Sequence, residues 1–290
     1  MGHQLAANRY GKSGIRLATV ARDGATHRFT DLDVRITLEG SFEAAHVDGD
    51  NSEVLPTDTM RGTCFALARD GIESVAGFAR RVAERLLVAS PATRRVTVRI
   101  VSHPWERLSV DGAPHPHGFR PAAGGDAVVT LVQDRDAPPS LTGGASGVRL
   151  LKTTGSAFSG FLEDAYTTLP PTRDRIMATT VEAAWGTTDP DVDHARLAVE
   201  VPETFSAAFA THDVSESVQH TLHAMGTAVL DVHEEVLWIR FRLPNEHHNL
   251  VDLSPYGLDN PGAVFVVADR PFGVIEGVVS RDGVEPPPAW

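Results

Sequence analysis

The sequence predicts an α+β fold of two tandem modules, each a four-stranded antiparallel sheet with two helices packed on one face. Two observations support this prediction. A helical pattern occurs twice, at a separation of about half the chain, and strand-like segments surround both copies in the same order. Because strands joined locally pair antiparallel and the helices are inserted together, the helices should cover one face of each sheet.

The two long helices have the same pattern and the same first residues. In residues 72–90, apolar residues recur at three- and four-residue spacing, and arginines and glutamates fall on the opposite side. Residues 216–232 repeat this stripe, and the triplet Glu-Ser-Val stands at the start of both segments. A further helix is expected before each of them, over 57–68 and 192–210. The repetition indicates an internal duplication.

Alternation of apolar and polar residues predicts four strands in each half. They cover 15–21, 34–42, 95–101 and 127–132, and then 148–153, 176–185, 236–243 and 264–268. We place the first module at 1–136, a linker rich in Gly and Pro at 137–147, and the second module at 148–290. Half-covered sheets leave edges to be paired, so we expect an oligomer that closes them into a barrel, with pockets between subunits.

The composition is typical of a soluble globular protein, with 42% apolar residues, 22% charged residues and a formal net charge of -12. This charge, without a basic stripe, argues against nucleic-acid binding. No apolar run approaches the roughly 20 residues that span a bilayer, and neither a signal peptide nor a C-terminal Ser-Lys-Leu is present, so we expect a cytoplasmic protein without membrane contact. The single cysteine, Cys64, should be a small buried side chain.

A polar cluster, residues 245–248, follows Pro244 at the end of a predicted strand. Proline cannot donate a ladder hydrogen bond, so the strand should end there and the cluster should lie at the rim of the sheet, where sites are often built. Acid–base chemistry and metal binding are both open to it. Adjacent strand residues point to opposite faces, which disfavours Glu246, His247 and His248 as joint metal ligands.

Two further residues have a binding interpretation beside an ordinary structural one. Arg175 offers a planar guanidinium that can hold a carbonyl or a delocalised anion through two hydrogen bonds, or it can pair with Asp174 at the surface. Gln219, in the first turn of its helix, has an amide donor and acceptor that suit the edge of a planar heterocycle, or it is a solvated helix residue. The residues themselves leave both alternatives open.

Together with other segments, these residues form motifs that resemble those of the urate oxidase (uricase) family. In chain order the motifs are Tyr-Gly-Lys at 10–12, Asp-Asn-Ser at 50–52, Thr-Asp-Thr at 57–59, the stretch Lys152–Leu169, Asp-Arg-Ile at 174–176, Ser-Val-Gln at 217–219 and Pro-Asn-Glu-His-His at 244–248. They extend over nearly the whole chain, and their spacing fits the duplicated architecture. The resemblance implies the tunnelling fold (T-fold), in which a homotetramer of two-module subunits builds a barrel around a central tunnel.

The resemblance also implies a reaction in purine catabolism. Urate would be oxidised by O₂ and water to 5-hydroxyisourate and hydrogen peroxide, with no metal, flavin or other cofactor. The sequence is consistent with this expectation, since it has no Gly-x-Gly-x-x-Gly after a strand, no Walker loop and no His-Glu-x-x-His. The expected partners are therefore urate, O₂ and further copies of the same chain.

Roles for the substrate-binding residues follow from the same resemblance. Arg175 and Gln219 would clamp the ring carbonyls and nitrogens of urate. Phe158 would stack beneath the purine, although an ordinary core position is its alternative. Val218 would contact the substrate through its backbone, and Asp58 would do so through its backbone N–H.

Lys12, Thr57 and His247 resemble the family's proton-handling group, with Asn245 beside the bound oxygen. Desolvation disfavours the charged form of a lysine, which can then accept a proton through a neighbouring hydroxyl. The family arrangement implies that Lys12 and Thr57 come from one chain, and His247 and the substrate clamp from its neighbour. Thr57 also begins a helix, where it is expected to act as an N-cap.

Two other functions remain as alternatives. The chain could be a metal-dependent enzyme of the same fold that acts on pterins or hydrolyses purines, with Glu246, His247 and His248 as ligands. It could also be a non-catalytic oligomer that binds a purine. The sequence departs from the family where Arg61-Gly62 replaces the usual Lys-Asn pair, and Gly62 is expected to loosen its helix.

Overall fold

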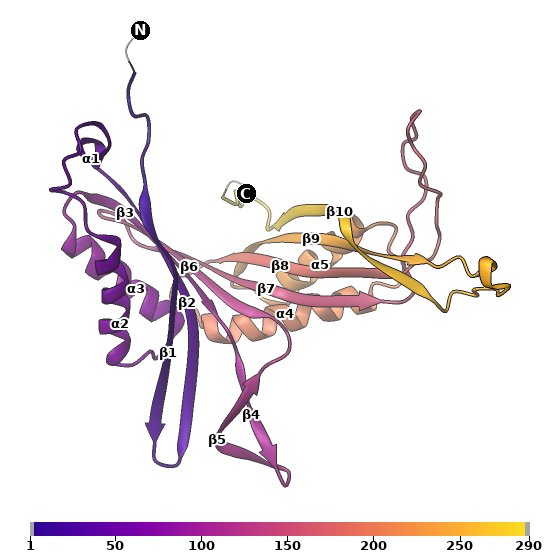
Figure 1. Cartoon of the computed structure of the whole chain (residues 1–290), viewed down its shortest axis with the longest axis horizontal. Helices are drawn as coiled ribbons and strands as arrows, with labels where there is room; N and C mark the ends of the chain where they lie inside the picture. Colours follow the sequence, from indigo (N-terminus) through magenta and orange to yellow (C-terminus); the bar gives the residue numbers. More distant parts are fainter. Residues whose placement is uncertain (1–2, 288–290) are drawn as a thin grey trace. The chain divides into compact units, whose positions relative to one another are not determined.

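The computed structural model describes residues 3–287, which form two compact units (Figure 1). One unit comprises the chain up to Gly144 together with Asp189–Ala198, and the other comprises Ala145–Thr188 and the chain from Val199 onward. Each unit contains antiparallel strands with helices packed on them. The predicted α+β class is therefore confirmed, whereas the division at 136 and 148 stays a prediction.

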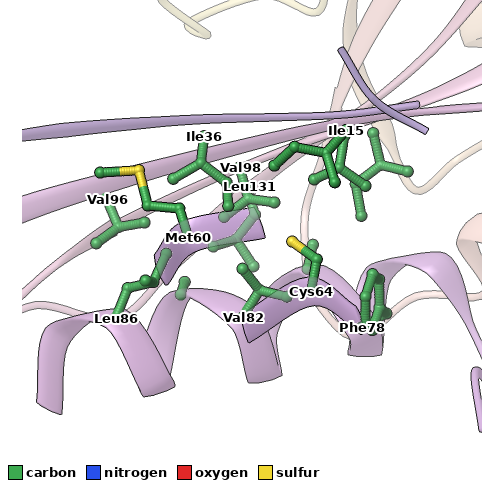
Figure 2. Packing of buried hydrophobic residues seen from close by; sticks show 14 of the residues in the cluster. Ile15, Ile36, Met60, Cys64, Phe78, Val82, Leu86, Val96, Val98 and Leu131 are labelled. Atoms are coloured by element: carbon green, nitrogen blue, oxygen red, sulfur yellow. The ribbon is translucent and has the colours of Figure 1, made fainter. Parts of the chain in front are cut away.

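The first unit has the strand order β1-β2-β3-β6, and all neighbours are antiparallel. Alternate residues of the strands are buried, and the helices pack on that face (Figure 2). Cys64 lies in this core, as predicted, and burial raises the pKa of its thiol to about 12. The elements are β1 (Tyr10–Asp23), β2 (Thr26–Gly40), α1 (Glu43–Val47), α2 (Thr57–Arg69), α3 (Val75–Ala89), β3 (Thr93–Ser102) and β6 (Asp126–Asp134).

The second unit has the strand order β7-β8-β9-β10. Its core includes an edge-to-face contact between Phe205 of α4 and Phe241 of β9, with ring centroids 5.5 Å apart. Helix α5 packs on β9 and β10. The elements are β7 (Ser140–Lys152), β8 (Met177–Thr187), α4 (His194–Thr211), α5 (Val218–Val232), β9 (Val236–Leu250), the 3-10 helix η1 (Ser254–Tyr256) and β10 (Phe265–Ser280).

The repeated Glu-Ser-Val triplet caps a helix in each half of the chain. The hydroxyl of Ser74 accepts a hydrogen bond of 3.0 Å from the backbone N–H of Gly77, and Ser217 accepts one of 3.1 Å from His220. These bonds satisfy N–H groups that the first turn of a helix leaves without partners. The cap sets the start of α5 at Val218, so Gln219 lies in its first turn.

The segment predicted as a linker is mostly a strand. β7 begins at Ser140, and Gly143, Gly144 and Ala145 are buried within it. A glycine-rich segment is typical of a loop, but glycine within a strand also permits close approach of neighbouring groups. The glycines of this segment lie within a strand. The prediction of a plain linker at 137–147 was therefore wrong from Ser140 onward.

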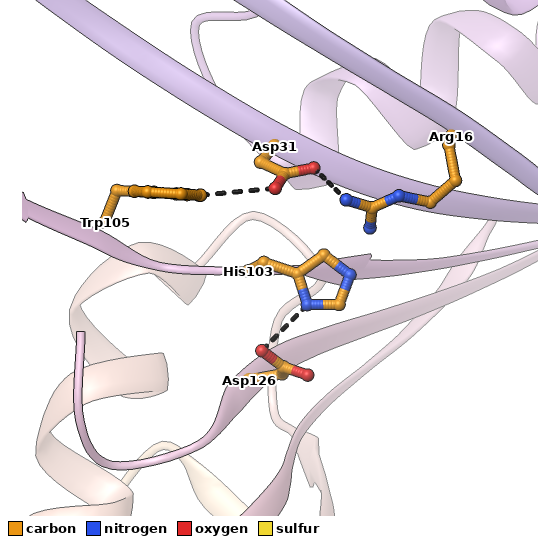
Figure 3. A network of polar contacts seen from close by, with 5 residues as sticks. All are labelled: Arg16, Asp31, His103, Trp105 and Asp126. Carbon is orange, nitrogen blue, oxygen red and sulfur yellow. Dashed lines mark hydrogen bonds and ion pairs between the residues drawn. The ribbon is translucent and has the colours of Figure 1, made fainter. Parts of the chain in front are cut away.

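A hairpin of β4 (Trp105–Val110) and β5 (Ala113–Pro121), which the strand pattern did not predict, is inserted between β3 and β6. Its base is attached to the first sheet by polar contacts (Figure 3). The indole N–H of Trp105 donates to Asp31 at 3.2 Å, and Asp31 also pairs with Arg16. His103 lies 2.9 Å from the carboxylate of Asp126. These contacts give His103 a structural place outside the site.

Within residues 3–287, no helix combines the length and the apolar character needed to cross a bilayer. The last three residues, on which the expectation about a peroxisomal signal rests, lie outside the described part of the chain.

Candidate active site

Phe158 and Arg175 lie against each other in the second unit. The guanidinium carbon of Arg175 is 5.3 Å from the centroid of the Phe158 ring, a cation–π distance. The other close ring is Phe161, stacked on Phe158 at 5.0 Å and an interplanar angle of 17°. Phe158 is half-buried, so it is a partly accessible stacking surface rather than an ordinary core residue.

The charge of Arg175 is not taken up by the neighbouring carboxylate. Asp174 instead accepts hydrogen bonds from the hydroxyl of Thr154 and the backbone N–H of Gly155, both 2.9 Å long. The Nε of Arg175 is buried and has no hydrogen-bond partner among the described residues. Burial lowers the pKa of the guanidinium, because the charged form loses solvation. The group is therefore suited to bind an anion or a carbonyl from outside the chain.

Backbone bridges hold the segment of Phe158 beside the start of α5. Ser156 pairs with Ser215, where the N–H of Ala157 donates to the carbonyl of Ser215 at 2.7 Å. The buried hydroxyl of Ser215 lies 2.6 Å from that of Thr221 in α5. This network fixes the N-terminus of α5, whose free N–H groups and positive dipole end favour a negatively charged or carbonyl-bearing ligand.

The packing of α5 on the sheet indicates which strand residues lie near its first turn. Leu222 packs against Gly277 of β10, which is paired with Phe241 of β9. Val218 precedes Leu222 by one helical turn, about 6 Å, and that length covers about two strand residues. Because α5 is joined to β9 by a short turn and runs back along it, α5 begins near the level of Leu243, two residues before Asn245.

The sequence predicted that this strand ends at Pro244, but β9 continues to Leu250. The described pairing of β9 with β8 stops at Arg242, whereas the pairing with β10 continues on the other side and includes Asn245 and His247. The missing N–H of proline removes one donor and does not break both ladders. The polar cluster therefore lies within a strand and not after its end.

The cluster is divided between the two faces of β9. Asn245 and His247 continue the period-two row of the buried residues before them, so they share the face that α5 covers. Glu246 accepts a hydrogen bond of 2.5 Å from Thr180 of β8, and Nδ1 of His248 lies 3.2 Å from the backbone oxygen of Glu246. Among residues 3–287, no three His, Cys, Asp or Glu side chains are arranged to hold a metal ion.

The first unit brings Lys12 and Thr57 to one region through Tyr10. The Tyr10 hydroxyl donates to the backbone oxygen of Leu55 at 3.1 Å and accepts from its N–H at 2.9 Å, which ties β1 to the segment before α2. Burial raises the pKa of Tyr10, which keeps the hydroxyl neutral. Lys12 is half-buried in β1, two residues after Tyr10, and Thr57 follows Leu55 by two residues.

Two details of α2 differ from expectation. Pro56 takes the N-cap position and Thr57 is the first helical residue, so the predicted capping role of Thr57 was wrong. The helix continues past Gly62 to Arg69, although Gly62 was expected to loosen it. The carboxylate of Asp58 forms an exposed ion pair of 2.7 Å with Arg61, the residue that departs from the family pattern.

Gly11 gives the Tyr-Gly-Lys motif a physical basis and a prediction. A Cβ at this position would lie 1.9 Å from the backbone oxygen of Ile36, so a side chain would force β1 away from β2 beside Lys12. Gly11→Ala should therefore lower the free energy of unfolding by about 1–3 kcal/mol, measured by urea denaturation. Gly62→Ala, whose Cβ meets nothing within 4 Å, should not lower it. Equal stability of both variants would contradict the prediction.

The predicted site residues are thus divided between the two units, and among them Phe158 and Arg175 are in direct contact. The second unit holds a stacking ring, a cation, an amide at a helix start and an imidazole, which together suit a planar anionic heterocycle. Sequence reasoning missed the role of Asp174, because its position beside Arg175 suggested an ion pair. The group in the first unit is Lys12, Thr57 and Asp58. The group in the second unit is Phe158, Arg175, Val218, Gln219, Asn245 and His247.

Comparisons with known proteins agree with this chemistry. A family model described as Uricase matches residues 8–129 and 141–276. A uricase of Arthrobacter globiformis is 38% identical over 280 residues, which cover 96% of this chain and 90% of that protein. One from Danio rerio is 34% identical, with 94% and 93% covered. The crystal structure of uricase from Arthrobacter globiformis has a TM-score of 0.91 at 37% identity and covers 99% of this chain and 98% of that one.

Proposed function

The chain belongs to the uricase family and is a urate oxidase, and we propose that it oxidises urate without a metal or flavin, at sites completed by two subunits of a homotetramer. Its fold is the tunnelling fold, and its substrates are urate and O₂. The observation that carries the proposed site is the half-buried Arg175 guanidinium beside the Phe158 ring, with the carboxylate of Asp174 engaged elsewhere.

Urate fits the group of residues in the second unit. It is a planar ring system that carries a negative charge at neutral pH, so it can stack on Phe158 while Arg175 binds a ring carbonyl and nitrogen. Gln219 offers both a donor and an acceptor to the opposite edge. The backbone N–H of Val218, at the positive end of α5, adds a further donor.

Proton transfer falls to Lys12, Thr57 and His247 in this proposal. The urate monoanion gives up a second proton through the Thr57 hydroxyl to the amine of Lys12, because an amine is a better base than a hydroxyl. The electron-rich dianion then reduces O₂ held near Asn245. Water then adds to the oxidised ring and gives up a proton to His247. The products are 5-hydroxyisourate and hydrogen peroxide. Urate itself supplies both electrons that reduce O₂, so the reaction balances without a further reductant.

The two-subunit site and the tetramer are supported by the edges of the sheets. β1 is an edge strand of the first unit's sheet and β10 of the second unit's sheet. Edge strands with unpaired backbone groups are usually covered or paired. Several apolar side chains of β10 are exposed, including Val266, Val267 and Phe272. Association of copies through these strands would cover them and would bring Lys12 and Thr57 of one chain to Arg175 of another.

The proposal is tested with purified protein dialysed against a strong chelator. We expect urate absorbance to disappear with consumption of one O₂ and release of one hydrogen peroxide per urate, at a rate that the chelator does not change. A metal-dependent hydrolase would consume no O₂ and would lose activity with its metal. A purely binding protein would leave the urate absorbance intact. Either result would refute the proposal.

A further inference from the structure

We propose that Asp174 is a positioning residue for substrate binding: it holds the Arg175 guanidinium in place against Phe158 while leaving the positive charge of Arg175 available to the substrate. This inference rests on the proposed role of Arg175 as the urate clamp. It concerns a carboxylate to which neither the motif pattern nor the proposed mechanism assigns a task.

The contacts of Asp174 join two segments that are distant in sequence. One carboxylate oxygen accepts from the hydroxyl of Thr154, and the other accepts from the backbone N–H of Gly155, each at 2.9 Å. The hydroxyl of Thr172 donates to the backbone oxygen of Asp174 at 3.0 Å. Both carboxylate oxygens and the main chain of Asp174 are therefore engaged, and the chain bends where this happens.

A second tie between the same segments lies close by. Phe158 and Thr172 exchange two backbone hydrogen bonds, of 2.8 and 2.9 Å. With one tie on Asp174 and the other on Thr172, the segment that carries Phe158 and the residue before Arg175 cannot shift independently. The 5.3 Å contact between the guanidinium and the ring follows from this pair of ties.

Gly155 meets Asp174 in an unusual backbone conformation. Its φ is +71°, in the left-handed region that favours glycine, and a Cβ there would lie 2.7 Å from the backbone oxygen of Asp213. The local backbone is thus shaped so that its N–H points to the Asp174 carboxylate. Because the Asp174 carboxylate already accepts hydrogen bonds from an N–H and an O–H donor, it does not require a hydrogen bond from the neighbouring guanidinium.

This arrangement matters for an anionic substrate. A carboxylate paired with Arg175 would compete with urate for the same donors and would have to be displaced before binding. With Asp174 engaged by Thr154 and Gly155, the buried Nε of Arg175 has no partner among residues 3–287. The free enzyme therefore carries a fixed and unneutralised donor, which is the preorganisation that favours binding of an anion.

The test compares Asp174→Ala, Asp174→Asn and Asp134→Ala in the full oligomeric enzyme. Asp174→Ala should raise KM for urate about tenfold to a hundredfold and change kcat less than about threefold, because two bonds that orient the clamp are lost. Asparagine can accept from Gly155 and donate to the Thr154 hydroxyl, so Asp174→Asn should return KM to within about threefold of the wild type. Asp134→Ala removes a carboxylate that also holds two bonds, to Arg95, outside the site, and should leave KM unchanged.

An unchanged KM in Asp174→Ala, or parallel losses of kcat and thermal stability without a rise in KM, would overturn the inference. If Asp174→Ala does not fold, Thr154→Val removes one of the two bonds and should raise KM about threefold, while Thr154→Ser should not. Arg175→Gln separates the two proposals. If it keeps the wild-type KM, the clamp itself is wrong. If it raises KM while Asp174→Ala does not, only the positioning role is wrong.

Discussion

Replacing Arg175 with glutamine should lower kcat/KM for urate by about 10²-fold to 10⁴-fold. A guanidinium that makes two charge-assisted hydrogen bonds contributes about 1.5–3 kcal/mol with each, and about 1.4 kcal/mol corresponds to a factor of ten. Part of the loss should appear in kcat, because the second deprotonation increases the negative charge that Arg175 faces. Initial rates of urate disappearance over a range of urate concentrations measure both parameters.

Arg81 provides a matched control for this substitution. Its guanidinium carbon lies 5.7 Å from the centroid of the Phe78 ring, so the same kind of stacking pair is removed, but on α3 and away from the site residues. Arg81→Gln should keep kcat/KM within about twofold of the wild type. Arg175→Lys, which keeps the charge and loses the planar fork, should fall between the two. A wild-type kcat/KM in Arg175→Gln would contradict the clamp.

Local patterns in the sequence predict most of the fold, because they record burial and capping directly. The alternation predicted for residues 236–243 corresponds to alternating burial in β9 from Ile239 to Leu243, and the Glu-Ser-Val triplets mark two N-capped helices. The errors arise where pairing with a segment distant in sequence determines the local structure. Pro244 is a local stop signal, but β10 pairs with the chain on both sides of it. Prolines likewise conceal β5, where Pro114 and Pro116 lie within the strand.

The candidate site shows the same division. Residue types and motif spacing identify Arg175, Phe158 and Gln219 as binding residues through the family resemblance. They do not reveal that Asp174 faces Thr154, because adjacency in sequence suggests an ion pair with Arg175 and the true partners lie about 20 residues earlier. A contact between two loops that are distant in sequence cannot be predicted from the few residues around either one. For this reason the family resemblance could propose roles for these residues, whereas the contacts that hold them in place could not be predicted from the sequence.

Mixing two inactive variants should restore activity if each site takes its two halves from different chains. Lys12→Ala should lower kcat at least about 10²-fold by removing the proposed proton acceptor, and Arg175→Gln is impaired in the other half of the site. When the two chains are unfolded together, mixed equally and reassembled, chance brings an intact first unit to an intact second unit in about a quarter of the sites. The mixture should therefore recover about a quarter of the wild-type rate, measured as urate oxidation at saturating urate.

The control for mixing combines Lys12→Ala with Thr57→Ala. Both substitutions lie in the first unit, so every site receives one damaged first unit, whichever chains meet, and no activity should return. Recovery in this control would mean that activity does not require the two residues together. No recovery in the mixture of Lys12→Ala and Arg175→Gln chains, with reassembly confirmed by recovery of wild-type chains treated in the same way, would mean that both halves come from one chain. The contrast between the two mixtures therefore distinguishes a shared site from a site within a single subunit, independently of how many subunits the oligomer contains.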